Sequence, residues 1–295
     1  MAEAPQRQVD GATQEQAGSA GHGLRRVGVR AFYYAFMSLL AVGFLLPLIW
    51  MISSSLKPEA EVLSIPPSFV PTEVRWQNYA EVFDIIPIFF YNSSKLAFLN
   101  VVGILLTSSL AGYAFARLEF VGRDVLFSLL LATAIIPSIV YLIPQYIVFR
   151  EIGWIDTHYP LWVPRVLTPV FATFLMRQYF KTLPIELEDA ARIDGASNFT
   201  IYWRIMLPQT KPALAAIGVF TFLESWNDLF GPLIFLNSVD LMTLPVALAQ
   251  FQGEYFTQVS LLMAAATVSV IPVLVVYLFA QKYFIQGITM TGLKG

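Results

Sequence analysis

Long apolar segments constrain this chain more than any other feature of its sequence. Six stretches are dominated by apolar residues, and they cover residues 31–52, 91–116, 125–149, 161–176, 212–236 and 260–280. A helix of about 20 apolar residues crosses the hydrocarbon core of a bilayer. Only 13% of the 295 residues are charged, whereas soluble domains carry roughly 25%. The sequence therefore predicts an all-α polytopic membrane protein with six transmembrane helices.

Six crossings leave both termini on one side of the membrane, and the basic residues indicate which side. Thirteen of the 18 lysine and arginine residues fall on the side of the amino terminus and five on the other. Because basic loops stay in the cytoplasm, both termini are predicted to be cytoplasmic. Residues 1–23 are polar and rich in Ala, Gly and Gln, so we expect a disordered cytoplasmic tail before a six-helix transmembrane domain over residues 24–295.

A charged stretch between the fourth and fifth apolar segments, Glu186 to Pro208, predicts two short helices joined at a glycine. Pro184 suits a first helical turn, and Gly195 can end the first helix in the left-handed conformation. Ser197 or Asn198 can cap the second helix, and Pro208 is expected to end it. The second helix is predicted to carry one apolar stripe, because four apolar residues recur at helical spacing: Phe199, Tyr202, Trp203 and Met206. The charge rule places this loop, residues 184–208, in the cytoplasm.

The fifth apolar segment contains an unusual group of polar and aromatic residues. They are Thr221, Glu224, Trp226, Asn227 and Asp228. In a continuous helix the two carboxylates, four residues apart, would lie on one side. A carboxylate inside a bilayer costs about 2.5–3.5 kcal/mol by insertion scales unless it faces water or a partner. We therefore predict that these residues line a solute path, with Trp226 stacking on the solute. The alternative places Glu224 and Asp228 near a helix end or at a subunit contact.

The cytoplasmic stretch also contains residues at characteristic spacings. Asp189-Ala190-Ala191 is followed after three residues by Gly195, and after nine more by Ile205-Met206-Leu207-Pro208. This pattern resembles the coupling loop of ABC-importer permeases, except that Asp189 stands where the family usually has Glu; Glu188 precedes it. Further motifs look like the carbohydrate-importer branch, in particular the shorter permease of maltose-type systems. They are Trp226-Asn227-Asp228, Gly231-Pro232-Leu233, Leu244-Pro245-Val246, Ile271-Pro272 and Gly292-Leu293-Lys294-Gly295.

The resemblance, which runs from about Ala31 to the last residue, implies the type I importer permease fold with a cytoplasmic coupling helix-turn-helix. It implies a prokaryotic cell membrane, a second related permease, an ATPase dimer and an extracytoplasmic solute-binding protein. ATP and magnesium would be bound by the ATPase, with no cofactor in this chain, and the solute would be a sugar or polyol. The implied contacts with the ATPase are Glu188, Asp189, Ala190, Ala191, Asp194, Gly195, Ile205, Leu207 and Pro208.

Several other functions fit the sequence poorly. The chain has no cysteine and two histidines, so we expect no metal site. It has no Gly-x-x-x-x-Gly-Lys-Ser/Thr loop to hold a nucleotide phosphate, so it is expected not to hydrolyse ATP itself. A stand-alone secondary transporter that uses Glu224 and Asp228 for ion coupling is the alternative function, although it leaves the Glu186–Pro208 loop without a role. Lys95 and Arg165 are expected to snorkel to lipid headgroups.

Overall fold

The computed structural model describes residues 9–251 and 258–291, with side chains over 28–250 and 258–282. The fold over these residues is helical and contains no strand. The longer helices are α1 (Val9–Ser55), α4 (Pro87–Arg117), α5 (Arg123–Thr133), α6 (Ser138–Glu151), α8 (Val170–Thr182), α12 (Lys211–Trp226) and α15 (Val259–Thr291). The shorter ones are α2 (Glu59–Val62), α3 (Gln77–Ile85), α7 (Tyr159–Leu167), α9 (Glu186–Ile193), α10 (Asn198–Ile201), α11 (Leu207–Gln209), α13 (Phe230–Phe235) and α14 (Leu244–Phe251). A π-helical turn, η1 (Tyr202–Met206), and a 3-10 turn, η2 (Val239–Leu241), complete the set.

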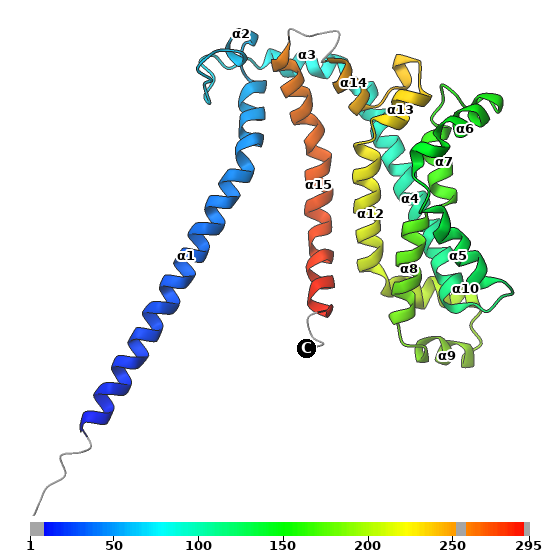
Figure 1. The fold of residues 1–295 in the computed structure, drawn as a ribbon, viewed down its shortest axis with the longest axis horizontal. Helices are drawn as coiled ribbons and strands as arrows, with labels where there is room; N and C mark the ends of the chain where they lie inside the picture. The colour runs from blue at the N-terminus through cyan, green and yellow to red at the C-terminus, as the bar shows by residue number, and fades with distance from the viewer. Residues whose placement is uncertain (1–8, 252–257, 292–295) are drawn as a thin grey trace, which may run out of the picture.

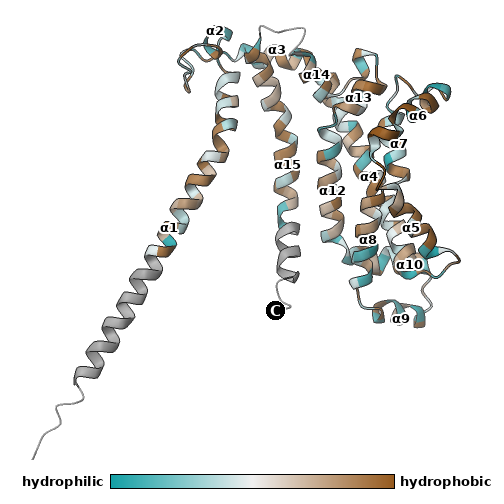
Figure 2. Ribbon diagram, viewed as in Figure 1, coloured by the Kyte–Doolittle hydropathy of each residue, from teal (hydrophilic) through white to brown (hydrophobic). Residues whose placement is uncertain are grey.

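Three of the predicted membrane segments form uninterrupted helices. Within the described residues, Gly28–Ser55 of α1, all of α4 and Val259–Lys282 of α15 are long and apolar enough to cross a bilayer. Figure 2 shows their apolar colour, and it shows hydrophilic residues in α9. These helices coincide with the first, second and sixth predicted segments. The chain is therefore a multi-pass membrane protein by the length and composition of its helices.

The other three predicted segments are not continuous helices. The third is divided into α5 and α6, which meet at 96°. The fourth breaks between α7 and α8 at Thr168-Pro169, and the fifth breaks between α12 and α13 at residues 227–229. Proline lacks the amide hydrogen that continues a helix, which accounts for the breaks at Pro137 and Pro169. Irregular backbone at membrane depth is tolerated where protein or a polar cavity satisfies its amide groups.

Helix α4 is the centre of the larger part of the molecule (Figure 1), where it packs against α7, α8 and α12. Buried residues of α4, α8, α9 and the α10–η1 helix form one core, which includes Tyr113, Met176, Phe180 and Tyr202. Helix α15 packs against α12 and α1. In Figure 1, α9 lies at the lower end of the molecule, whereas α2, α3, α6 and α13 lie at the upper end.

Helix α1 leans away from the rest of the molecule (Figure 1). The rest of the chain buries none of the most apolar stretch of its Gly28–Ser55 part. This part of α1 is long and apolar enough to cross a bilayer, as predicted for the first span. The predicted disordered tail does not agree with the structure over residues 9–23, because the backbone is helical from Val9. Extending an existing helix adds one hydrogen bond per residue without a new nucleation step, which explains the longer helix. Residues 1–8 of the predicted tail lie outside the described residues.

Contacts between distant segments tie the upper end together. Glu59 accepts hydrogen bonds from the backbone amides of Val259 and Ser260 at 2.6 and 2.8 Å, and it thereby caps α15. Negative charge at the amino terminus of a helix is stabilising because the helix dipole is positive there. Asn92 donates to the carbonyls of Asp240 and Met242. These contacts join α2 to α15 and α4 to η2.

The one buried histidine among the described residues gives a prediction about pH. The Nδ1 atom of His158 lies 3.1 Å from Lys95 Nζ, and its Nε2 lies 2.8 Å from the carbonyl oxygen of Leu241. A neutral ring satisfies both contacts, with Nδ1 accepting and Nε2 donating. Burial lowers the pKa of His158, and the Lys95 ammonium lowers it further, against the effect of the Leu241 carbonyl.

The pKa of His158 in the folded chain therefore lies below the unfolded value of about 6.5. The stability that the neutral His158 ring contributes is present above pH 6.5 and is lost as the pH falls through the folded pKa. We expect the purified chain to lose thermal stability between pH 7.5 and 5, and a His158→Gln variant to lose less. Thermal unfolding of both proteins in one detergent, at several pH values, measures the difference. Equal pH dependence in the two would contradict the prediction.

Candidate functional site

The predicted helix-turn-helix is present at the lower end, and its turn has the expected geometry. Gly195 has a φ of 78°, in the left-handed region, directly after α9. The amide of Ala196 donates to the carbonyl of Ala191 at 2.9 Å, and the amide of Gly195 donates to that of Arg192 at 3.0 Å. This pair of bonds is the Schellman arrangement that ends a helix at a glycine. Ser197 caps α10 by accepting from the amide of Thr200.

The second helix of this loop differs from the sequence prediction in two ways. Pro208 does not end it, because the helix passes through the π-helical η1 into α11, which contains Pro208, and the break follows at Thr210. The apolar stripe is also divided. Tyr202 and Met206 are buried against α4 and α8, while Phe199 and Trp203 are exposed and stack on each other. A π-helical turn has an i→i+5 hydrogen bond, so regular helical spacing does not predict its faces.

The implied ATPase contacts divide into two groups by exposure. Asp189, Ala190, Asp194, Gly195 and Pro208 are exposed, and Ile205 and Leu207 are half-buried. Glu188 and Ala191, three residues apart, instead face the interior of this chain. They lie on the one side of α9 that packs onto the membrane helices, so they are not available to a partner. The structure thus corrects the assignment of these two residues as direct contacts.

Exposed apolar side chains surround the exposed part of the motif. They are Ile185, Leu187, Ile193, Phe199 and Trp203, and Ile193 is 87% exposed. Apolar groups gathered on one exposed surface mark sites of protein association. None of them belongs to the sequence motif, because helical spacing alone does not show which apolar residues face outward.

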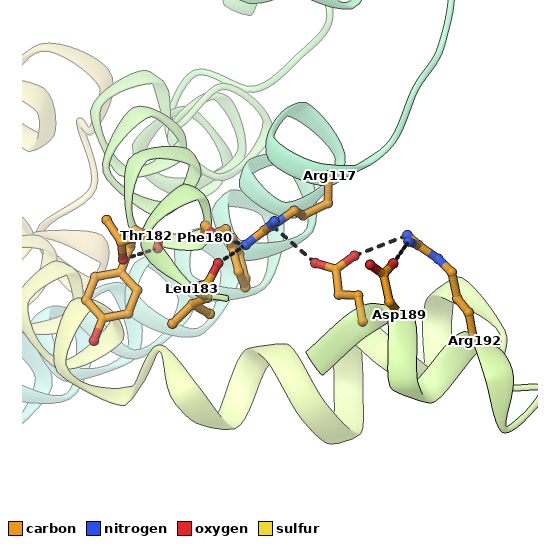
Figure 3. Close-up of polar contacts among 8 residues, drawn as sticks. Arg117, Phe180, Thr182, Leu183, Asp189 and Arg192 are labelled. Carbon is orange, nitrogen blue, oxygen red and sulfur yellow. Dashed lines mark hydrogen bonds and ion pairs between the residues drawn. The ribbon is translucent and has the colours of Figure 1, made fainter. Parts of the chain in front are cut away.

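The carboxylate of Glu188 is held by two arginines (Figure 3). Its Oε1 lies 3.1 Å from Nε of Arg117, the last residue of α4, and its Oε2 lies 3.2 Å from Nη2 of Arg192. Arg192 also pairs with Asp189 at 3.2 Å. Burial raises the pKa of Glu188, and the two arginines act in the opposite direction. A buried carboxylate is retained where such cations compensate for lost hydration.

The polar residues of the fifth segment surround a second site, in the membrane region. A cavity of about 200 Å³ lies where α7 breaks into α8, beside α4 and α12. Its polar lining consists of Asn100, Arg165, Thr168, Thr221 and Glu224. Two of the predicted solute-path residues, Thr221 and Glu224, therefore lie together here.

The other three predicted solute-path residues have different surroundings. Trp226 is buried in the core, where it stacks on Phe222 and donates from Nε1 to the carbonyl of Ser269 at 3.1 Å. Asn227 donates to the carbonyl of Leu223 in the last turn of its own helix. Neither lines the cavity. Because α12 ends at Trp226, Asp228 leaves the helix and is not beside Glu224 as the four-residue spacing predicted.

Asp228 instead forms an ion pair with Arg165. The Nη2 atom of Arg165 lies 2.9 Å from Asp228 Oδ2, and Asp228 Oδ1 accepts from the amide of Gly231 at 3.1 Å. The snorkelling assigned to Arg165 is therefore wrong, since its guanidinium turns to α12–α13 and lines the cavity. Asn100 is also beside it, fully buried, with its Nδ2 bonded to Ser225 and its Oδ1 without a partner. Opposite charges in two neighbouring apolar segments were the sequence signal for this pair.

Comparison with known proteins identifies the family of this chain. Residues 103–290, more than half of the chain, match the family described as "Binding-protein-dependent transport system inner membrane component". The chain belongs to this family. Members of the family are transport subunits, and membership favours the predicted importer component over a stand-alone secondary transporter.

Curated members of the family are similar over most of their length. The arabinooligosaccharides transport system permease protein AraQ of Halalkalibacterium halodurans is 35% identical over 267 residues, which are 89% of this chain and 94% of that protein. The trehalose transport system permease protein SugB of Mycobacterium tuberculosis is 32% identical over 90% of this chain and 98% of that protein. A chain in the crystal structure of a bacterial ABC transporter involved in the import of the acidic polysaccharide alginate superposes with a TM-score of 0.77. It is 25% identical and covers 88% of this chain and 97% of that one.

Proposed function

We propose that this chain is one permease subunit of an ATP-driven importer for a sugar or oligosaccharide. The observation that carries this proposal is the exposed surface on α9 and η1, in a member of a binding-protein-dependent transport family. We propose that this surface docks on a separate ATPase, which binds ATP and magnesium. The sugar relatives named above support the class of solute.

The proposed arrangement in the membrane has six crossings, with both termini and α9 in the cytoplasm. The first, second and sixth crossings would be α1, α4 and α15, and the other three would be the broken pairs α5–α6, α7–α8 and α12–α13. Basic residues at the lower end, among them Arg117, Arg123, Arg177, Lys181 and Arg192, support its cytoplasmic placement.

We propose that the cavity beside α12 is this subunit's share of the solute path. Its lining offers hydrogen-bond donors on Arg165 and acceptors on Glu224, Thr221 and the Oδ1 atom of Asn100, which suits the hydroxyl groups of a sugar. The Arg165–Asp228 pair offsets the charge of the guanidinium. The cavity is smaller than ordinary ligand pockets of roughly 300–1,000 Å³, so the second permease would complete the path. A larger groove of about 750 Å³ between α1, α14 and α15 has no charged side chain in its lining, which is apolar apart from the indole N–H of Trp50.

The partners are tested by purifying the tagged chain from its native membranes in a mild detergent. An ATPase and a second permease should co-purify, and binding protein added with its sugar should stimulate ATP hydrolysis by the reconstituted complex. Recovery of the chain alone in several detergents would contradict the proposal.

The solute path is tested by Glu224→Ala. A hydrogen bond to a charged group contributes about 1.5–3 kcal/mol, so sugar uptake into proteoliposomes should fall by about tenfold or more, with the complex still assembled. Glu81→Ala, which removes an exposed carboxylate from α3, is the matched control and should leave uptake unchanged. Unaltered uptake kinetics in Glu224→Ala would remove this residue from the path.

A further inference from the structure

One guanidinium at the lower end joins three helices (Figure 3). Arg117 is the last residue of α4, and its side chain is 10% exposed. Its Nη2 donates to the carbonyl of Phe180 at 2.6 Å and to that of Leu183, and both carbonyls belong to the last turn of α8 and the residue after it. Its Nε contacts Glu188 on α9. Arginine presents its N–H donors in one rigid plane, so these contacts set the positions of α4, α8 and α9 relative to one another.

Among the residues that the structure describes, Arg117 is the one ion-pair partner of Glu188 outside α9. The Glu188 side chain is 1% exposed, and its remaining oxygen is held by Arg192 one turn along α9. Among the described residues, the pair with Arg117 is the only ion pair between α9 and another element. If α9 moved away from α4, the buried Arg117 guanidinium would lose its carboxylate partner and Glu188 would keep only Arg192. Breaking a buried ion pair in this way is strongly unfavourable. The pair therefore favours joint movement of α9 and α4.

The packing beneath this pair is continuous with the membrane helices. Tyr113, one turn before Arg117 on α4, contacts the rings of Phe180 on α8 and Tyr202 on η1, with centroids 5.5 and 5.3 Å apart. Tyr202 also bonds through its hydroxyl to Ser109 of α4 at 2.8 Å. A rigid, close-packed connection of this kind transmits displacement rather than absorbing it.

We infer that the Arg117–Glu188 pair is the link through which movement of the coupling loop reaches α4, and that neither residue contacts the ATPase. This inference rests on the proposed docking of α9. Both are positioning residues: the exposed face of α9 receives the movement, and the pair on the opposite face passes it to the helix that lines the cavity through Asn100. Loss of the pair should uncouple ATP hydrolysis from transport rather than prevent assembly.

The test uses the complete complex in proteoliposomes, with its binding protein and a transported sugar. The variants are Glu188→Gln, Arg117→Gln and the double variant, and the readout is sugar transported per ATP hydrolysed. We expect this ratio to fall at least fivefold in either single variant while ATP hydrolysis and subunit co-purification persist. Because the two residues form one link, the double variant should be no worse than the worse single variant. Glu119→Gln, which removes an exposed carboxylate from the same end, is the control and should be normal.

A further variant distinguishes a loss of the Arg117–Glu188 link from a general loss of stability. Glu188→Asp keeps the charge but withdraws it by one methylene, so the complex should assemble with an intermediate ratio of transport to hydrolysis. A wild-type ratio in Glu188→Gln, or additive effects in the double variant, would overturn the inference.

Ala190→Asp distinguishes this failure from that of the docking proposal. If the ATPase still co-purifies with Ala190→Asp and uptake is normal, docking through α9 is wrong; if Ala190→Asp is inactive and Glu188→Gln is normal, only the link is wrong.

Discussion

Ala190→Asp should abolish sugar uptake while leaving the chain inserted in the membrane. Ala190 is exposed on α9, whereas Glu188 and Ala191 of the same helix are buried. A small residue allows another protein to approach the helix closely, and a carboxylate there would be buried without a partner on docking. An unpaired charge in an interface weakens association by about 2–5 kcal/mol. That corresponds to a loss of affinity of about 30-fold or more.

The measurement is uptake by cells that express the complex, together with co-purification of the ATPase. Thr182→Asp is the matched control, because it adds the same group at an exposed position at the end of α8. We expect the control to transport normally and Ala190→Asp to be recovered from membranes without its ATPase. Normal uptake by Ala190→Asp would contradict the docking surface. Gly195→Asp should also reduce uptake, through backbone strain at a φ of 78°.

Gly112→Val should destabilise the folded membrane domain. A Cβ atom at Gly112 of α4 would lie 2.5 Å from Cβ of Met176 and 3.0 Å from the backbone nitrogen of Arg177. Neither is the free end of a flexible side chain, so α8 would have to move away from α4. Overpacking of this kind costs about 1–3 kcal/mol, occasionally more, and it would act directly beneath Arg117 and α9.

Thermal unfolding of the purified chain and its yield from membranes measure this effect. We expect a lower Tm and a reduced yield for Gly112→Val. Gly218→Val is the matched control, because a Cβ at Gly218 would meet Leu105 only at 3.8 Å, an ordinary van der Waals distance. Equal Tm values for Gly112→Val and the wild type would show that α4 and α8 are not closely packed at this point.

Local features of the sequence determined the parts of the fold that depend on neighbouring residues. Apolar runs of sufficient length predicted α1, α4 and α15, because hydrophobic length is a property of the segment itself. The turn at Gly195 and the cap at Ser197 were also predictable, since both rest on conformations and hydrogen bonds within a few residues. The family resemblance rested on the same local motif.

Tertiary structure decided which residues of these segments meet. Arg165 and Asp228 are 63 positions apart, and the pairing depends on the break after α12, which turns Asp228 out of its helix toward the arginine that lines the cavity. Glu188 and Arg117 are 71 positions apart, and no spacing within α9 indicates that Glu188 faces inward to an arginine of α4. Trp226 entered the core because a partner carbonyl on α15 was available to its indole. Helical periodicity describes one helix at a time, whereas burial and charge pairing depend on neighbours that only the packed molecule supplies.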